Sequence, residues 1–433
     1  MMNKAMAQIK GLIGEGHVVD SAAEMAKFLR GNGKPLAVVF PGSTAEVSGL
    51  VKLANELNLK IAVGGQVVES KGLDGGLALV LSRMNKILEI DHANLVATVE
   101  PGILHAAFVT KMEEEGLNFP PEPFAVETGS VGGCFAIGDT DSKAFQYMPT
   151  RTYLLGYEMV LPTGEVLDIG NKCIKNVSGY DLIHFAVGSR GTLGIFTKLL
   201  IKLLPPPEVK YAVLADFASI HKASIAFTTL IKRNIHPTRL NLINATLAKN
   251  TFPATEGNLV MVDLEGFKAS TELLAEEISS VFKLAGAKNI RIVTNADEYV
   301  KIWRAWLSLR GELNTQDVER ILDVNVGPMK MPPALKALEE ITGDLAGYPG
   351  IVLEGLLGHI RMLLPTAAEK NQLAGKVNAL AMSFGGNVSG VLGSRLVCEA
   401  YNDAEMWQGI TSLINQIRKQ FDPKGILAPG ASL

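Results

Sequence analysis

Cysteine is scarce in this sequence, and its spacing excludes several classes of protein. The chain has three cysteines, Cys134, Cys173 and Cys398, and none of them forms a C-x-x-C pair. A disulfide framework or a zinc ribbon needs more cysteines at closer spacing. A typical iron–sulfur cluster needs four thiolate ligands. We therefore expect no disulfide scaffold and no metal cluster bound through cysteine.

Long apolar runs and an excess of charge are also missing. No apolar stretch approaches the ~20 residues of a membrane-spanning helix, and residues 1–16 lack the apolar core of a signal peptide. The net charge is -3, with basic and acidic residues interspersed, so the sequence offers no basic face for nucleic acid. The sequence predicts a cytoplasmic protein without a transmembrane segment, and leaves open whether partners associate it with a membrane.

The chain is long and apolar enough for two domains, with 433 residues of which 47% are hydrophobic. Residues 17–35 are predicted to form a helix followed by a glycine turn. Residues 36–40 and 60–63 are predicted strands, joined by a helix that begins with a capping box at Ser43 and Glu46. The pair Gly64-Gly65 follows the second strand instead of opening a helix, so this β-α-β unit is not a dinucleotide fingerprint.

Glycine is abundant, and two clusters carry the strongest chemical signal. Gly132-Gly133 and the run 188–194 flank two predicted strands, 157–161 and 166–169, which are joined by the turn 162–165. Glycine lets backbone N–H groups approach a phosphate or a ring oxygen without a side chain in the way. Tight turns in a β-rich domain explain the same spacing, so the glycines alone do not decide the function.

The order and wording of these segments favour a ligand site. The chain reads S-V-G-G from Ser130, then TRTYLLGYEMVLPTGEV, K-N-V-S-G-Y-D-L and V-G-S-R-G-T-L-G-I. It resembles the FAD-binding domain of flavoprotein oxidases of the vanillyl-alcohol oxidase type, and within them the group that contains the D subunit of glycolate oxidase and the D-lactate dehydrogenases. The resemblance runs from about residue 36 to residue 207 and returns in QIRKQFDPKGILAPG, where Ala428 replaces the usual asparagine.

The resemblance implies an α+β fold. We expect a two-subdomain FAD-binding domain at 1–207, a ferredoxin-like α+β cap domain at 208–383, and a C-terminal segment at 384–433 that returns to the FAD domain. Residues 211–293 fit this cap, because they read as β-α-β-β-α-β. Further cap elements are expected as helices at 297–310, 332–342 and 367–383 and as strands at 322–326 and 351–356.

The resemblance also implies which residues bind FAD. The family's P-R-G-G-G-T loop corresponds to residues 62–70, AVGGQVVES, which lack the third glycine and the threonine. The proline-rich segment 116–123 resembles the approach to the flavin, and Cys134 is expected to be a small packed residue rather than a reactive thiol. The implied cofactor-binding residues are Gly64, Gly65, Gln66, Val67, Pro121, Ser130, Gly132, Gly133, Cys134, Ala136, Gly188, Gly191, Gly194 and Ile195.

The substrate motifs of the family are largely lost. Members that oxidise 2-hydroxy acids hold a divalent metal ion with two histidines and a glutamate from G-H-x-G-D-G-N-x-H and G-E-H-G, and a histidine removes the hydroxyl proton. Residues 358–365 read GHIRMLLP, which keeps only His359. Residues 389–394 read SGVLGS, with Val391 and Leu392 where Glu-His belongs. We therefore expect no bound metal ion.

Three functions remain open. The first is an FAD-dependent dehydrogenase with a rebuilt pocket, in which His359 or Arg361 acts on an unfamiliar small molecule. The second is an FAD-bearing subunit that passes electrons between partners, such as iron–sulfur or electron-transfer-flavoprotein-like subunits, without a substrate of its own. The third is a structural subunit that has lost FAD. Because cysteine is too scarce for a cluster, electrons would leave to an external acceptor, and assembly with further copies of the chain is left open.

Several charged residues have two interpretations. Arg304, Arg310, Arg361 and Arg395 lie in or near segments that the family uses around its pocket, and a guanidinium suits a carboxylate. Exposure to solvent or pairing with an acidic residue is the more common role of arginine. His184 lies in a strand-like run and is expected to be packed rather than catalytic.

Overall fold

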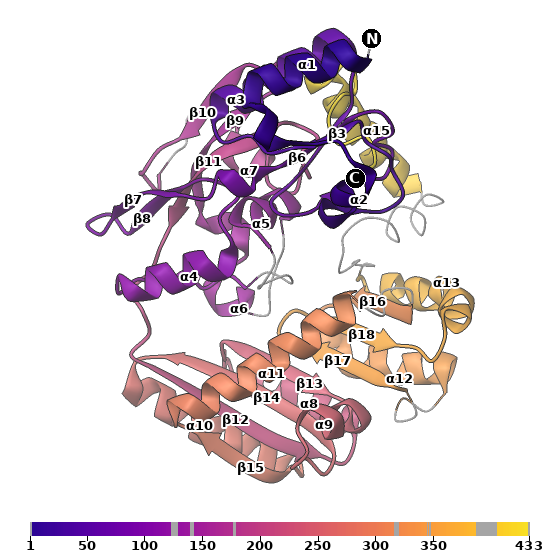
Figure 1. The fold of residues 1–433 in the computed structure, drawn as a ribbon. Coiled ribbons are helices and arrows are strands. Elements are labelled where there is room, and N and C mark those ends of the chain that lie inside the picture. Colours follow the sequence, from indigo (N-terminus) through magenta and orange to yellow (C-terminus); the bar gives the residue numbers. More distant parts are fainter. Residues whose placement is uncertain are drawn as a thin grey trace. The chain divides into compact units, whose positions relative to one another are not determined.

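The computed structural model describes residues 2–122, 129–138, 143–175, 179–315, 320–343, 345, 348–386 and 405–431. The chain divides into two compact units. Unit 1 consists of residues 1–140, 149–206 and 402–433, and unit 2 of residues 141–148 and 207–401. In Figure 1, unit 1 holds most of the indigo to magenta elements together with the yellow helix α15 (Glu405–Phe421), and unit 2 holds the pink to orange elements.

The first part of unit 1 is built on a four-stranded sheet. Its strands, in spatial order, are β1 (Val18–Val19), β3 (Ala37–Val39), β6 (Leu77–Val80) and β4 (Ile61–Gly64). Helix α3 (Thr44–Leu57) joins β3 to β4, and Ser43 Oγ accepts a hydrogen bond from the Glu46 amide at 3.2 Å, which confirms the predicted cap. Strand β6 lies between β3 and β4, so the two predicted strands are parallel but not neighbours.

Residues 17–35 do not form the single helix that the sequence predicted. They fold as β1, the one-turn helix α2 (Ala22–Met25), the 3-10 turn 26–28 and β2 (Leu29–Arg30). Val18 and Val19 pair with β3, so tertiary strand pairing overrides the local helical pattern. The predicted glycine turn is present, with Gly31 at φ 89°.

The second part of unit 1 is an antiparallel five-stranded sheet. Its strands, in spatial order, are β10 (Val166–Gly170), β9 (Leu154–Val160), β11 (Ile195–Lys202), β8 (Val96–Val99) and β7 (Ile87–Asp91). Strands β9 and β10 confirm the predicted pair around the turn at 162–165. The helices around it are α4 (His105–Glu114), α5 (Val131–Ile137) and α7 (Leu182–Phe185). His184 lies on α7 and is exposed, so the prediction of a packed strand residue was wrong.

The C-terminal segment completes the first sheet of unit 1. The amide of Ile61 donates to the Ile426 carbonyl at 2.7 Å, and the amide of Ala428 donates back to the Ile61 carbonyl at 2.7 Å. The carboxylate of Asp422 accepts the amides of Ile426 and Leu427 at 2.9 and 2.7 Å. The chain end is therefore fixed beside β4, directly before Gly64. At the other end of the chain, α1 (Met2–Ile13) packs on α3.

Unit 2 is built on an antiparallel seven-stranded sheet. Its strands, in spatial order, are β15 (Lys288–Val293), β12 (Val209–Phe217), β14 (Asn258–Gly266), β13 (Arg239–Ile243), β17 (Gly350–Glu354), β18 (His359–Leu363) and β16 (Ile321–Asn325). The first four confirm the predicted ferredoxin-like unit. Strand β18 was not predicted, and it forms a hairpin with β17 through the turn at residues 355–358.

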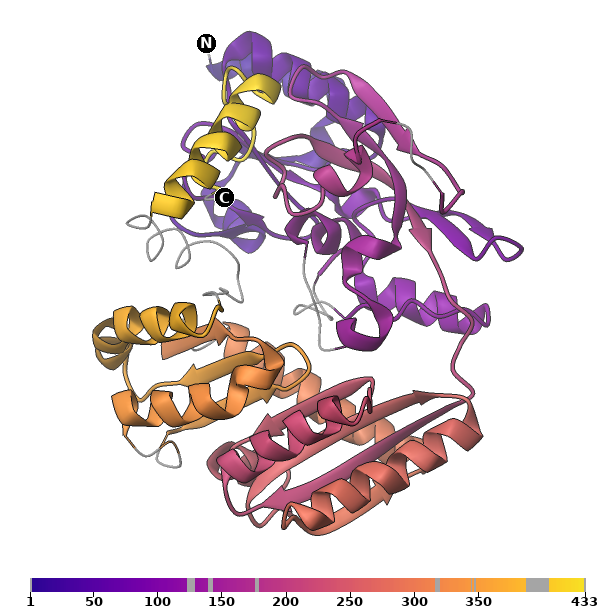
Figure 2. The ribbon, with the colours of Figure 1, turned by 180° about the vertical axis from the view of Figure 1, so that it is seen from behind.

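Helices cover both faces of this sheet. Helices α8 (Ile220–Lys232) and α10 (Lys268–Leu284) lie on one face, and α11 (Ala296–Thr315) lies on the other (Figure 2). Under α11 a core forms around Trp303 and Trp306. The other described helices of unit 2 are α6 (Ala144–Tyr147), α9 (Ala245–Thr251), α12 (Met331–Thr342) and α13 (Ala367–Ser383).

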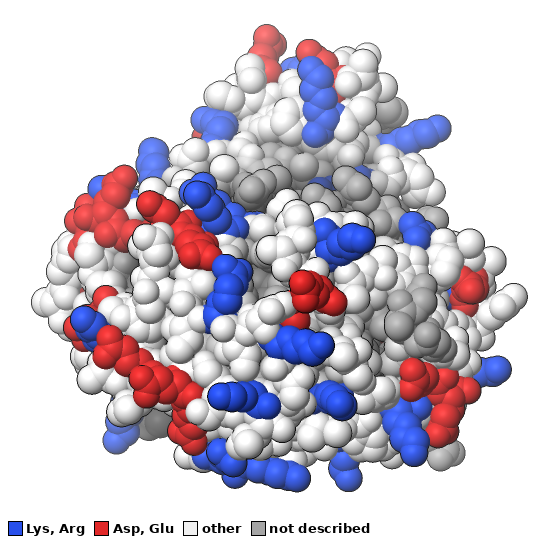
Figure 3. Space-filling model, turned by 90° about the horizontal axis from the view of Figure 1, so that it is seen from below, with Lys and Arg blue, Asp and Glu red and all other residues white. Residues whose placement is uncertain are grey.

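Two further observations concern the length of the helices and the charge on the surface. None of the described helices is long and apolar enough to span a membrane. On the face seen in Figure 3, lysine and arginine side chains are scattered among acidic ones instead of gathering into one block. This distribution matches the near-neutral net charge of -3.

Candidate functional site

The glycine loop after β4 presents unused backbone donors. In the described part of the chain, the amides of Gly65, Gln66 and Val67 donate no hydrogen bond. A Cβ added at Gly64 would overlap the Val67 carbonyl, and one added at Gly65 would overlap Ser130 Oγ. The loop can therefore close this tightly only with glycine at both positions. Free amides in such a loop suit the anionic oxygens of a pyrophosphate.

Helix α5 brings the second predicted segment to the same place. Its N-cap Ser130 accepts the Gly133 amide at 3.1 Å. Gly132 donates to the Pro101 carbonyl at 2.8 Å, and a Cβ there would overlap Pro101. Because Ser130 also contacts the position of Gly65, the two predicted glycine segments lie side by side.

The third predicted segment contacts the other end of α5. The amide of Gly188 donates to the Phe135 carbonyl at 3.1 Å, and the amide of Arg190 donates to the Ala136 carbonyl at 2.9 Å. Gly191 has φ 74° and open space where a Cβ would be. The structure thus brings Gly64–Gly65, Ser130–Ala136 and Gly188–Gly191 together within unit 1.

Four of the predicted cofactor residues have structural contacts of their own. Gly194 and Ile195 begin β11 and pack against β9, where a Cβ at Gly194 would overlap Met159. The carbonyl of Pro121 accepts a hydrogen bond from His105 Nε2 at 2.7 Å. Cys134 is buried, and its thiol donates to the Ser130 carbonyl at 3.2 Å, so the expectation of a packed thiol is confirmed.

In unit 2 the two residues predicted to be catalytic lie on β18, inside a row of polar side chains on one sheet face. The residues of this row lie on neighbouring strands whose register brings them to the same level, and those on one strand are two residues apart. All of them therefore lie on one face of the sheet. The buried members are Asp263, Glu265, Arg239, Asn241, Glu354, His359, Arg361 and Asp323. This is the side of the sheet that α11 covers, because Ile243, Met261 and Val352 on it belong to the core around Trp303.

His359 lies between two carboxylates. Its Nδ1 is 2.8 Å from Glu354 Oε2, and its Nε2 bonds to Asp323 Oδ1. Burial alone would lower the pKa of His359, but the charges and hydrogen bonds of Asp323 and Glu354 outweigh it and raise the pKa to about 9. Arg361 Nη2 lies 3.6 Å from Asp323 Oδ2. At neutral pH the cluster holds two cations against two carboxylates, and an imidazolium cannot accept a proton.

A second charged cluster lies on β13 and β14. Arg239 Nη1 is 3.4 Å from Asp263 Oδ2, and its guanidinium lies 4.4 Å from the ring centroid of Trp303. The Tyr299 hydroxyl donates to Asp263 Oδ1 at 2.7 Å. Burial, together with the charge of Glu265, raises the pKa of Asp263 although Arg239 lies beside it. A carboxyl with a raised pKa is the kind of group that serves as a general base.

One buried polar side chain of this face is unsatisfied. Asn241 is 1% exposed, and neither its amide nitrogen nor its oxygen has a hydrogen-bond partner within the described residues. A buried amide without a partner costs free energy, so a site of this kind normally holds water or a ligand group.

The other arginines considered from the sequence do not join this face in the described residues. Arg304 is on α11 and exposed. The side chain of Arg310 and all of Arg395 lie outside the described residues, as does the segment 389–394. No group of three or more His, Cys, Asp and Glu side chains in the described ranges is arranged to hold a metal ion.

Reasoning from the sequence missed Asp263, Glu265, Arg239, Asn241, Asp323 and Glu354. A signal for them exists, because polar residues alternate with apolar ones in R-L-N-L-I, D-L-E, L-D-V-N and H-I-R-M-L. Alternation is normally taken as a strand with one face in solvent. Here that polar face is buried, and a single sequence does not distinguish the two cases.

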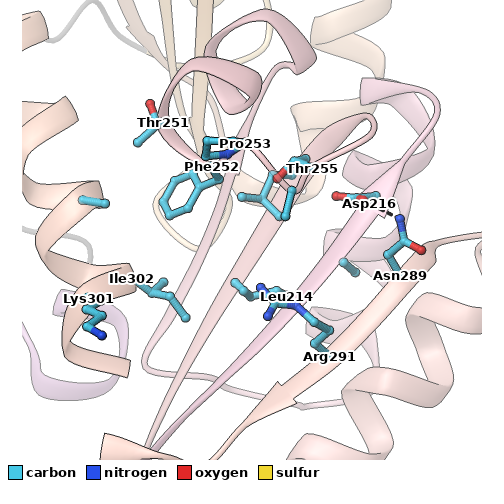
Figure 4. Close-up of a pocket in the computed structure, with 14 residues that line it drawn as sticks. Leu214, Asp216, Thr251, Phe252, Pro253, Thr255, Asn289, Arg291, Lys301 and Ile302 are labelled. Atoms are coloured by element: carbon cyan, nitrogen blue, oxygen red, sulfur yellow. Dashed lines mark hydrogen bonds between the residues drawn. The ribbon is translucent and has the colours of Figure 1, made fainter. Parts of the chain in front are cut away.

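A pocket of about 310 Å³ lies at the other end of the same sheet face. It is lined by residues of β12, β15 and α11 and by the loop at 251–255, with Phe252 and Ile302 on its apolar side (Figure 4). Two of its charged side chains have partners: Asp216 accepts from Asn289 at 2.9 Å, and Arg291 donates to Glu298 at 3.0 Å. His359 and Arg361 do not line it.

Comparisons with known proteins agree with the two units. The FAD binding domain family matches residues 35–170, and the family described as FAD linked oxidases, C-terminal domain, matches residues 206–431. Glycolate oxidase subunit GlcD of Bacillus subtilis is 28% identical over 92% of this chain and 88% of its own length. D-lactate dehydrogenase of Archaeoglobus fulgidus is 30% identical over 91% of this chain and 90% of its own.

Solved structures share the fold at low sequence identity. The 4-ethylphenol oxidase from Gulosibacter chungangensis superimposes with a TM-score of 0.73 at 18% identity, covering 98% of this chain and 95% of its own. An alkyldihydroxyacetonephosphate synthase gives a TM-score of 0.72 at 16% identity, covering 98% and 86%. The glycine loop, whose amides donate no hydrogen bond within the described residues, fits such a cofactor. The family matches over both halves and the 30% identity to the Archaeoglobus fulgidus enzyme make the chain a member of the FAD-linked oxidases, with FAD as its cofactor.

Proposed function

We propose that this chain is a dehydrogenase-type subunit with an altered, metal-free substrate site, which passes electrons to an external acceptor or a partner subunit. The relatives support the reaction class, because they include a glycolate oxidase subunit and D-lactate dehydrogenases. The observation that carries the metal-free site is the pairing of His359 and Arg361 with Asp323 and Glu354.

The β17–β18 hairpin suggests how the metal motif was replaced. The family motif G-H-x-G-D-G-N-x-H has its glycine-rich part between the first histidine and the asparagine. In this chain the turn at 355–358 lies between Glu354 and His359. If the two turns correspond, Glu354 stands at the first histidine, His359 at the asparagine and Arg361 at the second histidine. This register differs from the sequence-based alignment, which set His359 at the first histidine.

The replacement conserves charge rather than chemistry. A divalent ion would bring two positive charges to this face, and the imidazolium of His359 and the guanidinium of Arg361 bring the same number. Neither group can polarise a hydroxyl as a Lewis acid or take its proton. We infer that 2-hydroxy acids are not held here through a metal ion.

The residues of unit 1 fit the cofactor. The amides of Gly65, Gln66 and Val67 would bind its pyrophosphate, and the segments Ser130–Ala136 and Gly188–Gly191 would border the ring system. When bound, FAD would supply the acceptor for a hydride, which carries two electrons and one proton.

On the substrate side, Asn241 and Asp263 are the proposed functional pair. The amide of Asn241 can both donate to and accept from a substrate hydroxyl. Asp263 lies diagonally across from Asn241 on the neighbouring strand, since Asp263 pairs with Arg239 and Met261 pairs with Asn241. Its raised pKa suits the removal of the hydroxyl proton.

Anaerobic mixing of the FAD-loaded protein with a panel of alcohols and 2-hydroxy acids tests this site through bleaching of the flavin absorbance. We expect at least one compound to reduce the flavin in a reaction that Asn241→Leu slows by about tenfold or more, the loss expected for an unreplaced substrate hydrogen bond. Asn241→Leu should keep or raise the stability, since it removes an unsatisfied buried amide.

Asn244→Leu is the matched control. Asn244 is equally buried, but its amide donates to the Tyr348 carbonyl and accepts the Ile351 amide at 2.9 and 3.0 Å. It should lower stability and leave flavin reduction unchanged. Equal reduction rates in Asn241→Leu and the unmodified protein would contradict the proposed role of Asn241.

The internal pairing of the charges favours one second candidate, an electron-transfer subunit without its own substrate. Four buried cations, Lys143, Arg239, His359 and Arg361, face four buried acidic residues, Asp263, Glu265, Asp323 and Glu354. A face of this kind leaves no excess charge to bind a charged substrate. In that case no compound of the panel bleaches the flavin, whereas chemically reduced protein passes electrons rapidly to a redox partner.

A further inference from the structure

His105 is a buried polar residue outside the predicted flavin contacts, and it joins two of the segments that carry them. It begins helix α4, and its backbone amide donates to the Gly129 carbonyl at 2.9 Å. Its side-chain Nε2 lies 2.7 Å from the Pro121 carbonyl. His105 is therefore hydrogen-bonded both to Pro121 and to Gly129.

The contacts around His105 continue into the glycine cradle. The residue before it, Leu104, forms an antiparallel bridge with Ser130. The amide of Val131 donates to the Ile103 carbonyl at 2.9 Å. Ser130 is the N-cap of α5 and the residue against which Gly65 packs. A shift of His105 would thus move both the entrance of α5 and the wall of the loop at 65–67.

The environment of His105 fixes its protonation and tautomer. The side chain is 1% exposed and lies beside the Phe119 ring, at 5.7 Å between ring centroids. Burial lowers the pKa of His105 to about 4, although the hydrogen bond to Pro121 and the charge of Glu122 act in the other direction. A carbonyl only accepts, so Nε2 must carry the proton of the neutral ring. Nδ1 is then a bare acceptor, and it has no partner within the described residues.

We propose that His105 is a positioning residue for the cofactor. The hydrogen bond from its Nε2 to the Pro121 carbonyl and the hydrogen bond from its backbone amide to the Gly129 carbonyl hold α5 and the glycine loop at the spacing that binds FAD. The inference rests on the proposed role of Gly65 and Ser130 in FAD binding. A purely packing role predicts that any apolar side chain of similar size would serve. The positioning role requires the N–H donor.

The test compares FAD dissociation constants, measured by flavin fluorescence during titration of apoprotein, for three variants. His105→Leu removes the donor and should weaken FAD binding by about fivefold or more, the usual range for one lost buried hydrogen bond. His105→Gln puts an amide N–H near the position of Nε2 and should restore binding to within about threefold of the unmodified protein. Met112→Ala, at a buried residue of the same helix, should lower the unfolding midpoint without changing FAD affinity.

Nitrogen NMR of the apoprotein gives a readout independent of the flavin. The His105 ring should show the Nε2–H tautomer and remain neutral throughout the range above pH 5. Unchanged FAD affinity in His105→Leu, or equal losses in His105→Leu and His105→Gln, would overturn the inference. Gly65→Ala separates the two proposals: if it also leaves FAD affinity unchanged, the assignment of the cradle fails, and if it alone weakens binding, only the role of His105 fails.

Discussion

At the scale of single residues, Ala428 departs from the family motif and has a strained backbone conformation. The family has asparagine at this position, and here alanine adopts φ 44°, in the left-handed region. Asparagine and glycine tolerate this region better than alanine. The backbone is held there because the Ala428 amide donates to Ile61 and its carbonyl accepts from Arg418 at 2.9 Å.

We expect Ala428→Gly to raise the free energy of unfolding by about 0.5–1 kcal/mol, because relief of the left-handed strain exceeds the added chain entropy. Denaturant unfolding measures the change, and Ala428→Asn should act in the same direction. As a control, Ala7→Gly in the exposed face of α1 should lower stability by about 1 kcal/mol. If both Ala428→Gly and Ala428→Asn lowered the free energy of unfolding, the proposed backbone strain at Ala428 would be contradicted.

His359 predicts a pH dependence of stability. Its folded pKa of about 9 lies above the ordinary value of 6.5. The folded state therefore binds the proton more tightly, and this stabilisation is complete below pH 6.5 and is lost as the pH rises through 9. The difference corresponds to about 3 kcal/mol. Unfolding measured between pH 6.5 and 9.5 should show the decline.

His359→Gln is the control for this decline, since an amide keeps hydrogen bonds to Glu354 and Asp323 but does not titrate. The variant should be less stable at pH 6.5 and should lose most of the dependence on pH. If the unmodified protein and the variant change equally with pH, His359 is not protonated as described.

Among single residues, the sequence predicted the backbone part of the site and missed the side-chain part. Glycines are informative in a sequence because few other residues can occupy their positions, as at Gly64, Gly65 and Gly132. For Asn241 and Asp323, the residue type alone does not indicate a special position. Their significance comes from cross-strand register, which joins residues far apart in the chain.

At the scale of elements, helix α6 shows the limits of local prediction. Residues 143–147 follow the predicted flavin-binding helix in sequence, yet they belong to unit 2, where they contact β14 and the residues just before β13. Lys143 Nζ lies 2.8 Å from Glu265 Oε1, and the Tyr147 hydroxyl donates to Glu265 Oε2 at 2.7 Å. Nothing in the local pattern of this short helix indicates its partner.

Lys143→Met should lower the stability of unit 2 by about 3–5 kcal/mol, because it removes the cation that pairs directly with the buried carboxylate of Glu265. Thermal unfolding followed by tryptophan fluorescence is suitable, since Trp303 and Trp306 lie in the core of unit 2. Lys10→Met is the control. Lys10 pairs with Asp20 at 3.1 Å on the exposed surface, so its loss should cost less than about 1 kcal/mol. Equal effects would contradict the buried pair.

Longer elements were predicted correctly where the spacing of the apolar residues and the capping residue indicated the same element. Helix α3 and the ferredoxin-like part of unit 2 are examples, with Ser43 capping the helix. The prediction of a helix within residues 17–35 was wrong because Val18 and Val19 pair with β3. Strand β18 was missed because H-I-R-M-L carries two cations in a buried strand, which local propensity disfavours.

At the scale of the whole molecule, we propose that the chain combines an FAD site with an altered substrate site. Unit 1 has a glycine loop whose amides have no partner among the residues that the structure describes, and family matches extend over both halves of the chain. Unit 2 carries a row of buried charges that pair with one another, and the proposed register aligns this segment with the family's first metal motif. Because a fold does not fix the chemistry of its site, the substrate must be found by experiment.

Metal analysis combined with flavin reduction tests the proposed metal-free flavin site most directly. The purified protein is assayed for bound divalent ions and then mixed anaerobically with D-lactate or glycolate, with added Mn²⁺ or Zn²⁺ and with chelator. We predict FAD in a one-to-one ratio with the chain, no stoichiometric metal ion, and no metal-dependent reduction of the flavin. A tightly bound metal ion in a one-to-one ratio, together with reduction by D-lactate that the chelator abolishes, would contradict it.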